Sequence, residues 1–221
     1  MKIFHFVLPC IMALLSTCSL AGSGFLIDNQ QVSQVYICTQ NKSQFKENIS
    51  IKVKTGDEEI RIVPTVNYGY EPSVFLGDFI GNGLNQIFYW VNSGGSGAYS
   101  SSQVISLQNG KQITIYDSEN FKNTAKVELR DNLVQIKYLN NNYYLDASFA
   151  DLSENKNVYI SDVNTVMPVY NGGLGKYQIM QFQKVYIDYT ANNIGYLTSI
   201  IDLTLDGWNI VSVGTLSNFG Y

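Results

Sequence analysis

The chain has 221 residues, with 14 Lys and Arg against 18 Asp and Glu, and a formal net charge of −4. Hydrophobic residues make up 45% of the chain, enough for a domain to bury its own core. The acidic balance, without any continuous basic run, excludes the electrostatic signature of a nucleic-acid-binding protein.

The N-terminal segment 1–21 predicts an export signal. Lys2 supplies a short positive region, residues 3–15 are nearly continuously apolar, and Ser19-Leu20-Ala21 has the small-x-small pattern that precedes a signal peptidase cut. The apolar run is shorter than the roughly 20 residues that a membrane-spanning helix needs, so no membrane span is expected. The sequence therefore predicts a secreted protein, or one of the periplasm or cell envelope, with one mature domain at residues 22–221.

A lipoprotein is the alternative to a soluble exported protein. Leu15-Ser16-Thr17-Cys18 resembles a bacterial lipobox, in which the cysteine carries a lipid anchor and becomes the first residue. A cut after Ala21 instead removes Cys10 and Cys18, so Cys38 would remain alone and could form no internal disulfide. Because Cys38 lies in an apolar run, we expect a buried free thiol at this position.

Histidine chemistry is excluded from the mature chain. The only histidine, His5, lies inside the predicted export signal. Ser-His and Cys-His nucleophilic mechanisms and histidine-ligated zinc therefore need a residue that the mature protein lacks. The sequence also contains no phosphate-binding loop and no dinucleotide fingerprint, so no cofactor is expected.

The rest of the chain predicts β-strands almost throughout. Short runs rich in Val, Ile, Tyr, Phe and Thr alternate with breaks of Gly, Asn, Asp and Ser. The predicted strands cover residues 34–38, 49–54, 59–63, 73–77, 86–92, 99–107, 112–117, 124–130, 132–138, 142–148, 157–162, 178–188, 195–205 and 208–214. A short helical turn is expected near residues 150–154.

Tight turns between these segments predict hairpins. Asn109-Gly110 is the strongest of them, and Arg130-Asp131-Asn132, Asn140-Asn141-Asn142 and Asp206-Gly207 are similar. Strands joined by tight turns pair antiparallel. We therefore predict an all-β fold of antiparallel hairpins in propeller-like blades. A full propeller needs at least four blades of four strands, so a β-sandwich or a barrel is the alternative.

One glycine-rich segment resembles a known repeat. Residues 74–87 read Val-Phe-Leu-Gly-Asp-Phe-Ile-Gly-Asn-Gly-Leu-Asn-Gln-Ile, which is similar to the repeat of VCBS/FG-GAP-type secreted proteins. The glycine-serine loop at residues 93–99 resembles one in small exported bacterial proteins of this kind. The resemblance implies a calcium loop between two strands of a blade.

The calcium ligands implied by the resemblance are largely missing. The ligand positions fall on Asp78, Ile80, Asn82, Gln86 and the backbone carbonyl of Leu84. Only Asp78 is anionic, and Ile80 has no side-chain oxygen. Since calcium affinity follows the number of charged ligands, we expect a degenerate site that binds calcium weakly or not at all. The alternative is a purely structural turn, in which Asp78 and Asn82 cap the loop and the glycines adopt positive φ.

The same pattern is repeated faintly later in the chain. Residues 168–179 align with the first loop at an offset of 92, which pairs Gly83 with Gly175 and Gln86 with Gln178. Asp78 falls on Tyr170, so the second loop has no acid. A repeated loop and strand indicates a repeated β-unit.

The remaining side chains favour binding over catalysis. Aromatic groups at residues 88–90, at Tyr138 with Tyr143-Tyr144, and at Trp208 can fill a core or form a contact patch for a glycan or protein partner. We therefore predict an exported, non-enzymatic binding or structural module of the bacterial envelope or extracellular space. The alternative is a carbohydrate-active hydrolase that uses carboxylates alone, which needs two acids about 5–10 Å apart in a cleft. The acid groups available are Asp57-Glu58-Glu59, Asp146 with Asp151 and Glu154, and Asp202 with Asp206.

Overall fold

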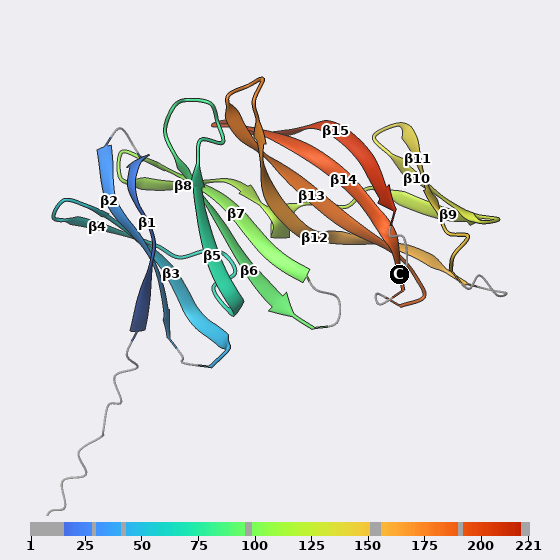
Figure 1. The fold of residues 1–221 in the computed structure, drawn as a ribbon, viewed down its shortest axis with the longest axis horizontal. Coiled ribbons are helices and arrows are strands. Elements are labelled where there is room, and N and C mark those ends of the chain that lie inside the picture. The colour runs from blue at the N-terminus through green and yellow to red at the C-terminus, as the bar shows by residue number, and fades with distance from the viewer. Residues whose placement is uncertain are drawn as a thin grey trace, which may run out of the picture.

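The computed structural model describes residues 16–27, 30–40, 43–95, 99–150, 156–189 and 192–217 (Figure 1). All fourteen predicted strands are confirmed, and one strand precedes them. The elements are β1 (Ser16–Ile27), β2 (Gln30–Gln40), β3 (Phe45–Thr55), β4 (Glu58–Ile62), β5 (Gly69–Gly77), β6 (Gln86–Gly94), β7 (Tyr99–Gln108), β8 (Lys111–Asp117), the 3₁₀ turn η1 (Ser118–Asn120), β9 (Lys126–Arg130), β10 (Leu133–Tyr138), β11 (Asn141–Asp146), β12 (Val158–Asn171), β13 (Lys176–Ile187), β14 (Asn193–Thr204) and β15 (Gly207–Ser217). Most of the predicted helical turn at 150–154 lies outside the described residues.

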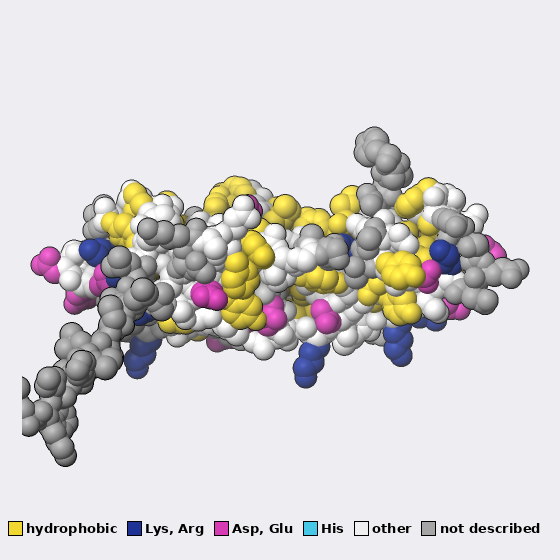
Figure 2. Space-filling model, turned by 90° about the horizontal axis from the view of Figure 1, so that it is seen from below, with side chains coloured by type: hydrophobic (Ala, Val, Ile, Leu, Met, Phe, Trp, Pro, Cys, Tyr) yellow, Lys and Arg dark blue, Asp and Glu magenta, His cyan; other side chains and the backbone are white. Residues whose placement is uncertain are grey.

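The strands form three antiparallel sheets, as predicted. One sheet has the order β1-β2-β3-β5-β6-β7-β8 with β4 beside β3, another is β11-β10-β9, and the third is β12-β13-β14-β15. Over the described ranges no sheet closes into a barrel, so that alternative is wrong. In the same part of the chain, no helix is long and apolar enough to cross a membrane. The sheets follow one another along an elongated molecule, whose long face appears in Figure 2.

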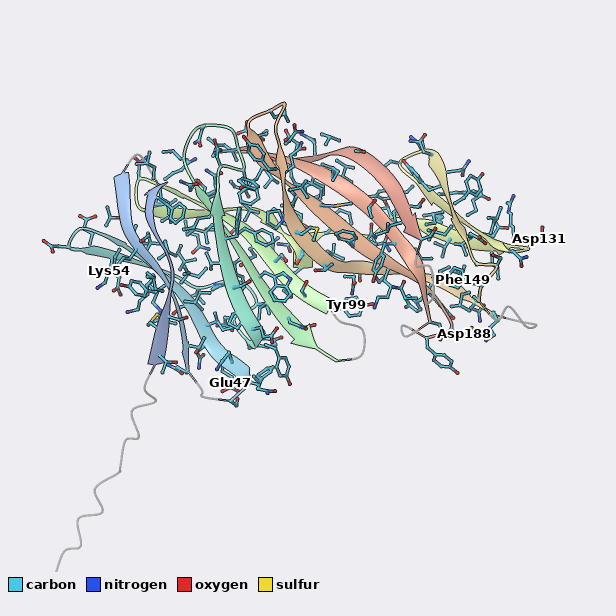
Figure 3. All side chains as sticks on the ribbon, viewed as in Figure 1. Glu47, Lys54, Tyr99, Asp131, Phe149 and Asp188 are labelled. Carbon is cyan, nitrogen blue, oxygen red and sulfur yellow. A yellow bond between two sulfur atoms is a disulfide. The ribbon has the colours of Figure 1, made fainter. Side chains whose placement is uncertain are left out.

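Two hydrophobic cores lie on opposite faces of β5–β8. Successive residues of a strand point to opposite faces, and on β6 Ile87 belongs to the smaller core while Phe88 belongs to the larger one. The smaller core lies between β5–β7 and strands β1–β4 at the other end of the same sheet. The larger core joins β5–β8 to β9–β11 and to the inner face of β12–β15. Side chains fill the spaces between the sheets in Figure 3.

The repeat predicted from residues 168–179 has a structural counterpart. In the β5–β6 hairpin, pairing runs from Ser73↔Trp90 to Gly77↔Gln86, and in the β12–β13 hairpin it runs from Thr165↔Phe182 to Val169↔Gln178. Every one of these pairs is related to its counterpart by the same offset of 92. The two hairpins therefore have the same register, although their sequences differ at most positions.

The next two strands of each sheet also correspond. Residues of β7 and β8 match residues of β14 and β15 at an offset of 96. The pair Ile105↔Thr114 is therefore equivalent to the pair Ile201↔Ile210. The irregularity between Val104 and Ile105 recurs between Ile200 and Ile201. A shared bulge at the same pair is a strong sign of one repeated unit, because bulges are specific features of a sheet. β5–β8 and β12–β15 are thus two copies of a four-stranded meander.

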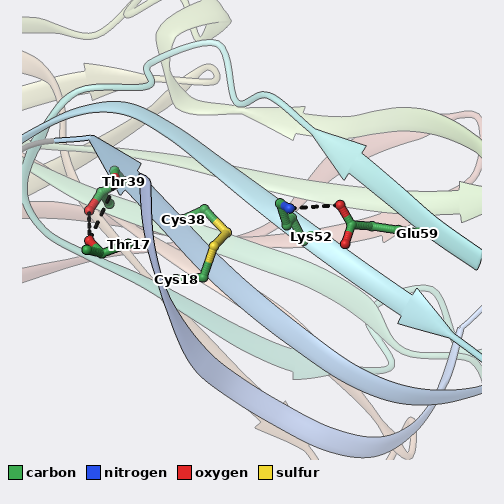
Figure 4. The surroundings of a disulfide bond; sticks show 6 residues. All are labelled: Thr17, Cys18, Cys38, Thr39, Lys52 and Glu59. Atoms are coloured by element: carbon green, nitrogen blue, oxygen red, sulfur yellow. Dashed lines mark hydrogen bonds and ion pairs between the residues drawn. A yellow bond between two sulfur atoms is a disulfide. The ribbon is translucent and has the colours of Figure 1, made fainter. Parts of the chain in front are cut away.

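The first strand differs from the sequence prediction. The predicted cut after Ala21 falls within β1, which pairs with β2 from Ser16↔Gln40 to Ile27↔Gln30. Cys38 is buried, as expected, but it is not free: it forms a disulfide with Cys18, directly opposite on β1 (Figure 4). The free thiol was expected for a chain cut after Ala21, which lacks Cys18, and it stays a prediction for that shorter chain, whereas in the full chain Cys38 is paired. Residues 1–15 lie outside the described residues.

Candidate functional site

The loop that begins at Asp78 is a turn held by its own side chains. The Asp78 carboxylate accepts hydrogen bonds from the backbone amides of Gly81, Asn82 and Gly83 at distances of 2.6, 3.3 and 2.7 Å. Asn82 Oδ1 accepts another from the Leu84 amide at 3.0 Å. Gly81 and Gly83 have φ values of +77° and +79°, which glycine adopts without steric cost.

Gln86 fixes the same loop from the start of β6. Its buried Oε1 accepts from the amides of Phe79 at 2.6 Å and Ile80 at 3.2 Å, and its Nε2 donates to the Leu84 carbonyl at 2.8 Å. The predicted ligand oxygens of Asp78, Asn82, Leu84 and Gln86 thus all accept an N–H within the loop. These N–H groups would compete with a calcium ion for the oxygen lone pairs. Among the described residues, no group of three or more His, Cys, Asp or Glu is arranged to hold a metal.

A separate polar cleft of about 800 Å³ lies where β7, η1 and β12 meet. We call it the serine cleft. Figure 3 labels one of its lining residues, Tyr99, at the start of β7. The cleft combines hydroxyl groups, two carboxylates and three aromatic rings, from Ser100, Ser101, Ser118, Glu119, Asp162, Tyr68, Tyr99 and Phe121.

Hydrogen bonds hold Glu119 in position at the edge of this cleft. Ser101 Oγ donates to Glu119 Oε1 at 2.6 Å, and the Glu119 amide donates to Asp117 Oδ1 at 3.0 Å. The other carboxylate oxygen of Asp117 accepts from Gln103 Nε2 at 2.8 Å. The Ser118 hydroxyl accepts from the Ser102 amide at 2.9 Å. The glutamate is therefore fixed through both its side chain and its backbone.

Hydrogen bonds also join the two walls of the cleft. Ser100 Oγ on β7 donates to Thr165 Oγ1 on β12 at 3.0 Å. Asn123, which follows η1, donates from Nδ2 to the Ser161 carbonyl on β12 at 2.9 Å. The walls come from the two copies of the repeated unit, so these bonds set the shape of the cleft.

The repeat shows which cleft residues are unusual. At equivalent positions, Ser100 and Ser101 on β7 correspond to Tyr196 and Leu197 on β14. Asp117 on β8 corresponds to Val213 on β15. β7 is buried along nearly its whole length, and burying polar groups costs free energy unless they are hydrogen-bonded. At these three positions the first copy has a smaller or more polar side chain than the second, while Ser102 and Gln103 correspond to Thr198 and Ser199 and are polar in both copies.

An aromatic contact links the cleft to the β12–β15 sheet. The Phe121 ring stacks on the Trp208 indole with a centroid distance of 5.7 Å, and Tyr116 meets the same indole edge to face at 6.2 Å. Trp208, one of the predicted contact residues, is 37% exposed. A molecule bound against Phe121 would therefore change the surroundings of Trp208.

Other predicted residues lie elsewhere. Phe88 and Tyr89 are buried in the two cores, and Trp90 packs beside the larger one. None of the predicted acids with described positions lines the serine cleft: Asp57, Glu58, Glu59, Asp146 and Asp206 are exposed, and Asp202 pairs with Lys176 at 2.9 Å. Asp151 and Glu154 lie outside the described residues. The sequence reasoning missed Glu119 and Asp162, although the polar run Ser100-Ser101-Ser102-Gln103 in a predicted strand was a visible signal.

The sequence is similar to that of a known bacterial protein. The chain is 25% identical over 174 residues to YybI, an uncharacterised protein of Bacillus subtilis (strain 168). The match covers 70% of this chain and 66% of the relative, so it spans slightly less than two thirds of that protein. No family model matches the chain, and no solved structure does.

Proposed function

We propose that the protein is an exported, non-enzymatic binding module of the bacterial envelope or extracellular space, with the serine cleft as its ligand site. The proposed ligand is a glycan. Sugars present many hydroxyl groups next to apolar C–H faces. The cleft offers the matching groups: serine hydroxyls and the Glu119 carboxylate for hydrogen bonds, and the Tyr68 and Tyr99 rings for apolar contact.

The observation that carries this proposal is the difference between the two copies of the repeated unit. A core strand is stabilised by apolar side chains, as at Leu197 in the second copy, which is fully buried in the larger core. Ser100 and Ser101, which border the cleft, are small and polar and therefore do not provide that apolar stabilisation. A polar set that is kept in one copy, fully hydrogen-bonded and beside a large cleft, supports a binding role there.

The Asp78 loop has a scaffold role in this proposal. Its oxygens are occupied by its own N–H groups, which supports the structural turn over a working calcium site. We propose that the two four-stranded meanders are blade-like units, in line with the resemblance to VCBS/FG-GAP-type repeats. Calcium binding would then be a property that this loop has lost while keeping its shape.

The direct test is binding of soluble oligosaccharides, followed by Trp208 fluorescence and by calorimetry. We expect saturable binding by the wild-type protein. The Glu119→Gln variant should bind at least tenfold more weakly, since it loses a charged acceptor at the cleft. Glu58→Gln, on an exposed hairpin away from the cleft, is the matched control and should bind normally. If Glu119→Gln binds as tightly as the control, the serine cleft is not the ligand site.

One observation favours the hydrolase alternative: the cleft is lined by two carboxylates, Glu119 and Asp162. Carboxylates on both sides of a glycosidic bond are sufficient for hydrolysis. Release of reducing ends from the same oligosaccharides, abolished in both Glu119→Gln and Asp162→Asn, would establish this activity. Binding without any release supports the binding module.

A further inference from the structure

Three tyrosines extend from the serine cleft along the adjoining ends of β12 and β13. Tyr99 lines the cleft itself. Tyr159 and Tyr186 are opposite each other on β12 and β13, and their rings stack with a centroid distance of 5.6 Å and an interplanar angle of 24°. We call these three residues the tyrosine shelf.

A hydrogen bond next to Tyr159 places this end of the shelf beside the cleft. Asn123, a cleft residue, donates from Nδ2 to the carbonyl of Ile160, the residue after Tyr159, at 3.4 Å. Burial raises the pKa of the Tyr186 phenol, and the nearby Tyr99 and Tyr159 hydroxyls raise it further. The stacked Tyr159–Tyr186 pair thus begins one residue from a backbone carbonyl that a cleft side chain contacts.

The shelf is not part of either hydrophobic core. None of the three rings belongs to the two core clusters or to the apolar residues packed against them. Tyr159 is 44% exposed even though its ring is stacked on Tyr186. Apolar rings that are ordered by stacking but left facing solvent are typical of a contact surface.

From this arrangement we propose that the tyrosine shelf is a second sugar subsite, so that the ligand is an extended oligosaccharide chain and not a single free sugar. The inference rests on the proposed function of the serine cleft. A tyrosine ring can cover the apolar face of a sugar while its hydroxyl bonds to a neighbouring sugar hydroxyl. One unit would occupy the cleft, and the units that follow would lie across Tyr99, Tyr186 and Tyr159.

The test measures how binding affinity depends on oligosaccharide length, in the wild-type protein and in variants that lack one shelf ring. The probes are β-1,4-linked oligomers of glucose and of N-acetylglucosamine, with one, two, four and six units, measured by calorimetry. We expect the affinity of the wild-type protein to rise at least tenfold from one to six units. Tyr159→Ala should lose that rise while binding the single sugar as the wild type does. Tyr186→Phe keeps the half-buried ring and removes only its hydroxyl, and should reduce the rise without affecting folding.

The control is Tyr144→Ala, which removes a tyrosine of similar exposure from β11. Its affinity should rise with oligosaccharide length as much as that of the wild-type protein. If Tyr159→Ala and the control both bind the six-unit chain like the wild type, the shelf is not a subsite, although the cleft can still bind sugar. If Glu119→Gln weakens binding at every length while affinity does not depend on length, the shelf proposal alone fails. If no oligomer binds the wild-type protein, the proposed function fails and the shelf proposal fails with it.

Discussion

The backbone amide of Tyr177 donates a hydrogen bond to the carbonyl of Asp78, with an N···O distance of 2.7 Å. This bond joins the equivalent loops of the two repeated units. The Tyr177 ring also packs edge to face on Phe75 at 4.9 Å and against Phe79 at 5.6 Å. The two copies thus contact each other through the segments that are most alike in sequence. The Asp78 loop is a joint between the copies as well as a turn within one of them.

The joint leaves no room for a side chain at Gly77. A Cβ there would lie 2.7 Å from Tyr177 Cδ2 and 2.9 Å from Phe75 Cε1, well inside van der Waals contact. We expect Gly77→Ala to lower the free energy of unfolding by about 1–3 kcal/mol, the usual cost of overpacking a well-packed site. Urea denaturation measures this. Gly172→Ala, in the equivalent hairpin, meets no atom within 4 Å and should be nearly neutral. Equal stability of the two variants would mean that Tyr177 does not pack on Gly77.

Calcium should leave the stability of the protein unchanged. Every oxygen of the predicted ligand set accepts an N–H group, and only the one from Asp78 carries charge. A ligand that binds only the folded state raises its stability in proportion to the logarithm of its concentration over Kd. We therefore expect the same melting temperature with millimolar calcium and with a chelator. A clear rise with calcium would contradict the structural turn and restore the metal site.

The sequence allowed all fourteen strands after residue 30 to be predicted, because alternating residues and Asn-Gly-type turns depend on local chemistry. Asn109 and Gly110, for example, have φ values of +50° and +72°, as such a hairpin turn requires. The serine cleft was beyond this reasoning, since Glu119 and Asp162 are brought together only when η1 packs beside β12. The pairing of Cys18 with Cys38 was missed for another reason. An export signal and a strand have similar apolar composition, and Ser16–Ile27 was assigned to the signal up to Ala21.

The disulfide gives a way to test whether the folded domain includes the residues before Gly22, because Cys18 is one of them. In a Cys10→Ser full-length chain under oxidising conditions, Cys18 and Cys38 should not react with a thiol reagent even after denaturation. Reduction should then lower stability by about 3 kcal/mol, the value expected for closing a loop of this length, since the two cysteines are 20 residues apart.

A chain that begins at Gly22 provides the comparison. It lacks Cys18, so its stability should not respond to a reductant. Residues 16–21 are all exposed, so this shorter chain loses strand pairing but little buried apolar surface, and it should still fold. A reductant that has no effect on the full chain either would show that the disulfide does not form.

Substitutions of Lys176 and Asp202, which form an ion pair, should have strongly non-additive effects on stability. Lys176 Nζ is 2.9 Å from Asp202 Oδ1 and donates to the Leu203 carbonyl at 3.0 Å, and Gln178 Nε2 donates to the same Asp202 oxygen at 3.0 Å. The Lys176 side chain is only 10% exposed, so breaking the pair leaves a partly desolvated charge. We expect Lys176→Met to cost about 2–4 kcal/mol. The double variant with Asp202→Asn should cost about 1–3 kcal/mol less than the sum of the single variants. Simple additivity in denaturation experiments would exclude the coupling.

Buried tyrosines should make the fold sensitive to alkali. Tyr116 is almost fully buried and its hydroxyl donates to Gln181 Oε1 at 2.8 Å. Burial, with a smaller effect from the Asp117 charge, raises the pKa of Tyr116 above its ordinary value, and burial also raises the pKa of Tyr89. In the unfolded chain these phenols lose their protons from about pH 10, while in the folded chain they stay neutral. Their contribution to stability is therefore complete below pH 10 and is lost as the pH rises above it.

The expected result is a free energy of unfolding that falls above pH 10 by about 1.4 kcal/mol per pH unit for each such tyrosine. Chemical denaturation at pH 8 and at several values above 10 measures the slope. Tyr116→Phe should lose about 1 kcal/mol at pH 8, because its hydrogen bond is gone, but should show a shallower fall above pH 10. Tyr170→Phe, at a site that is 58% exposed, is the control and should follow the wild type. If Tyr116→Phe keeps the full slope, the Tyr116 hydroxyl is not held neutral in the folded protein, and the alkaline sensitivity comes from other groups.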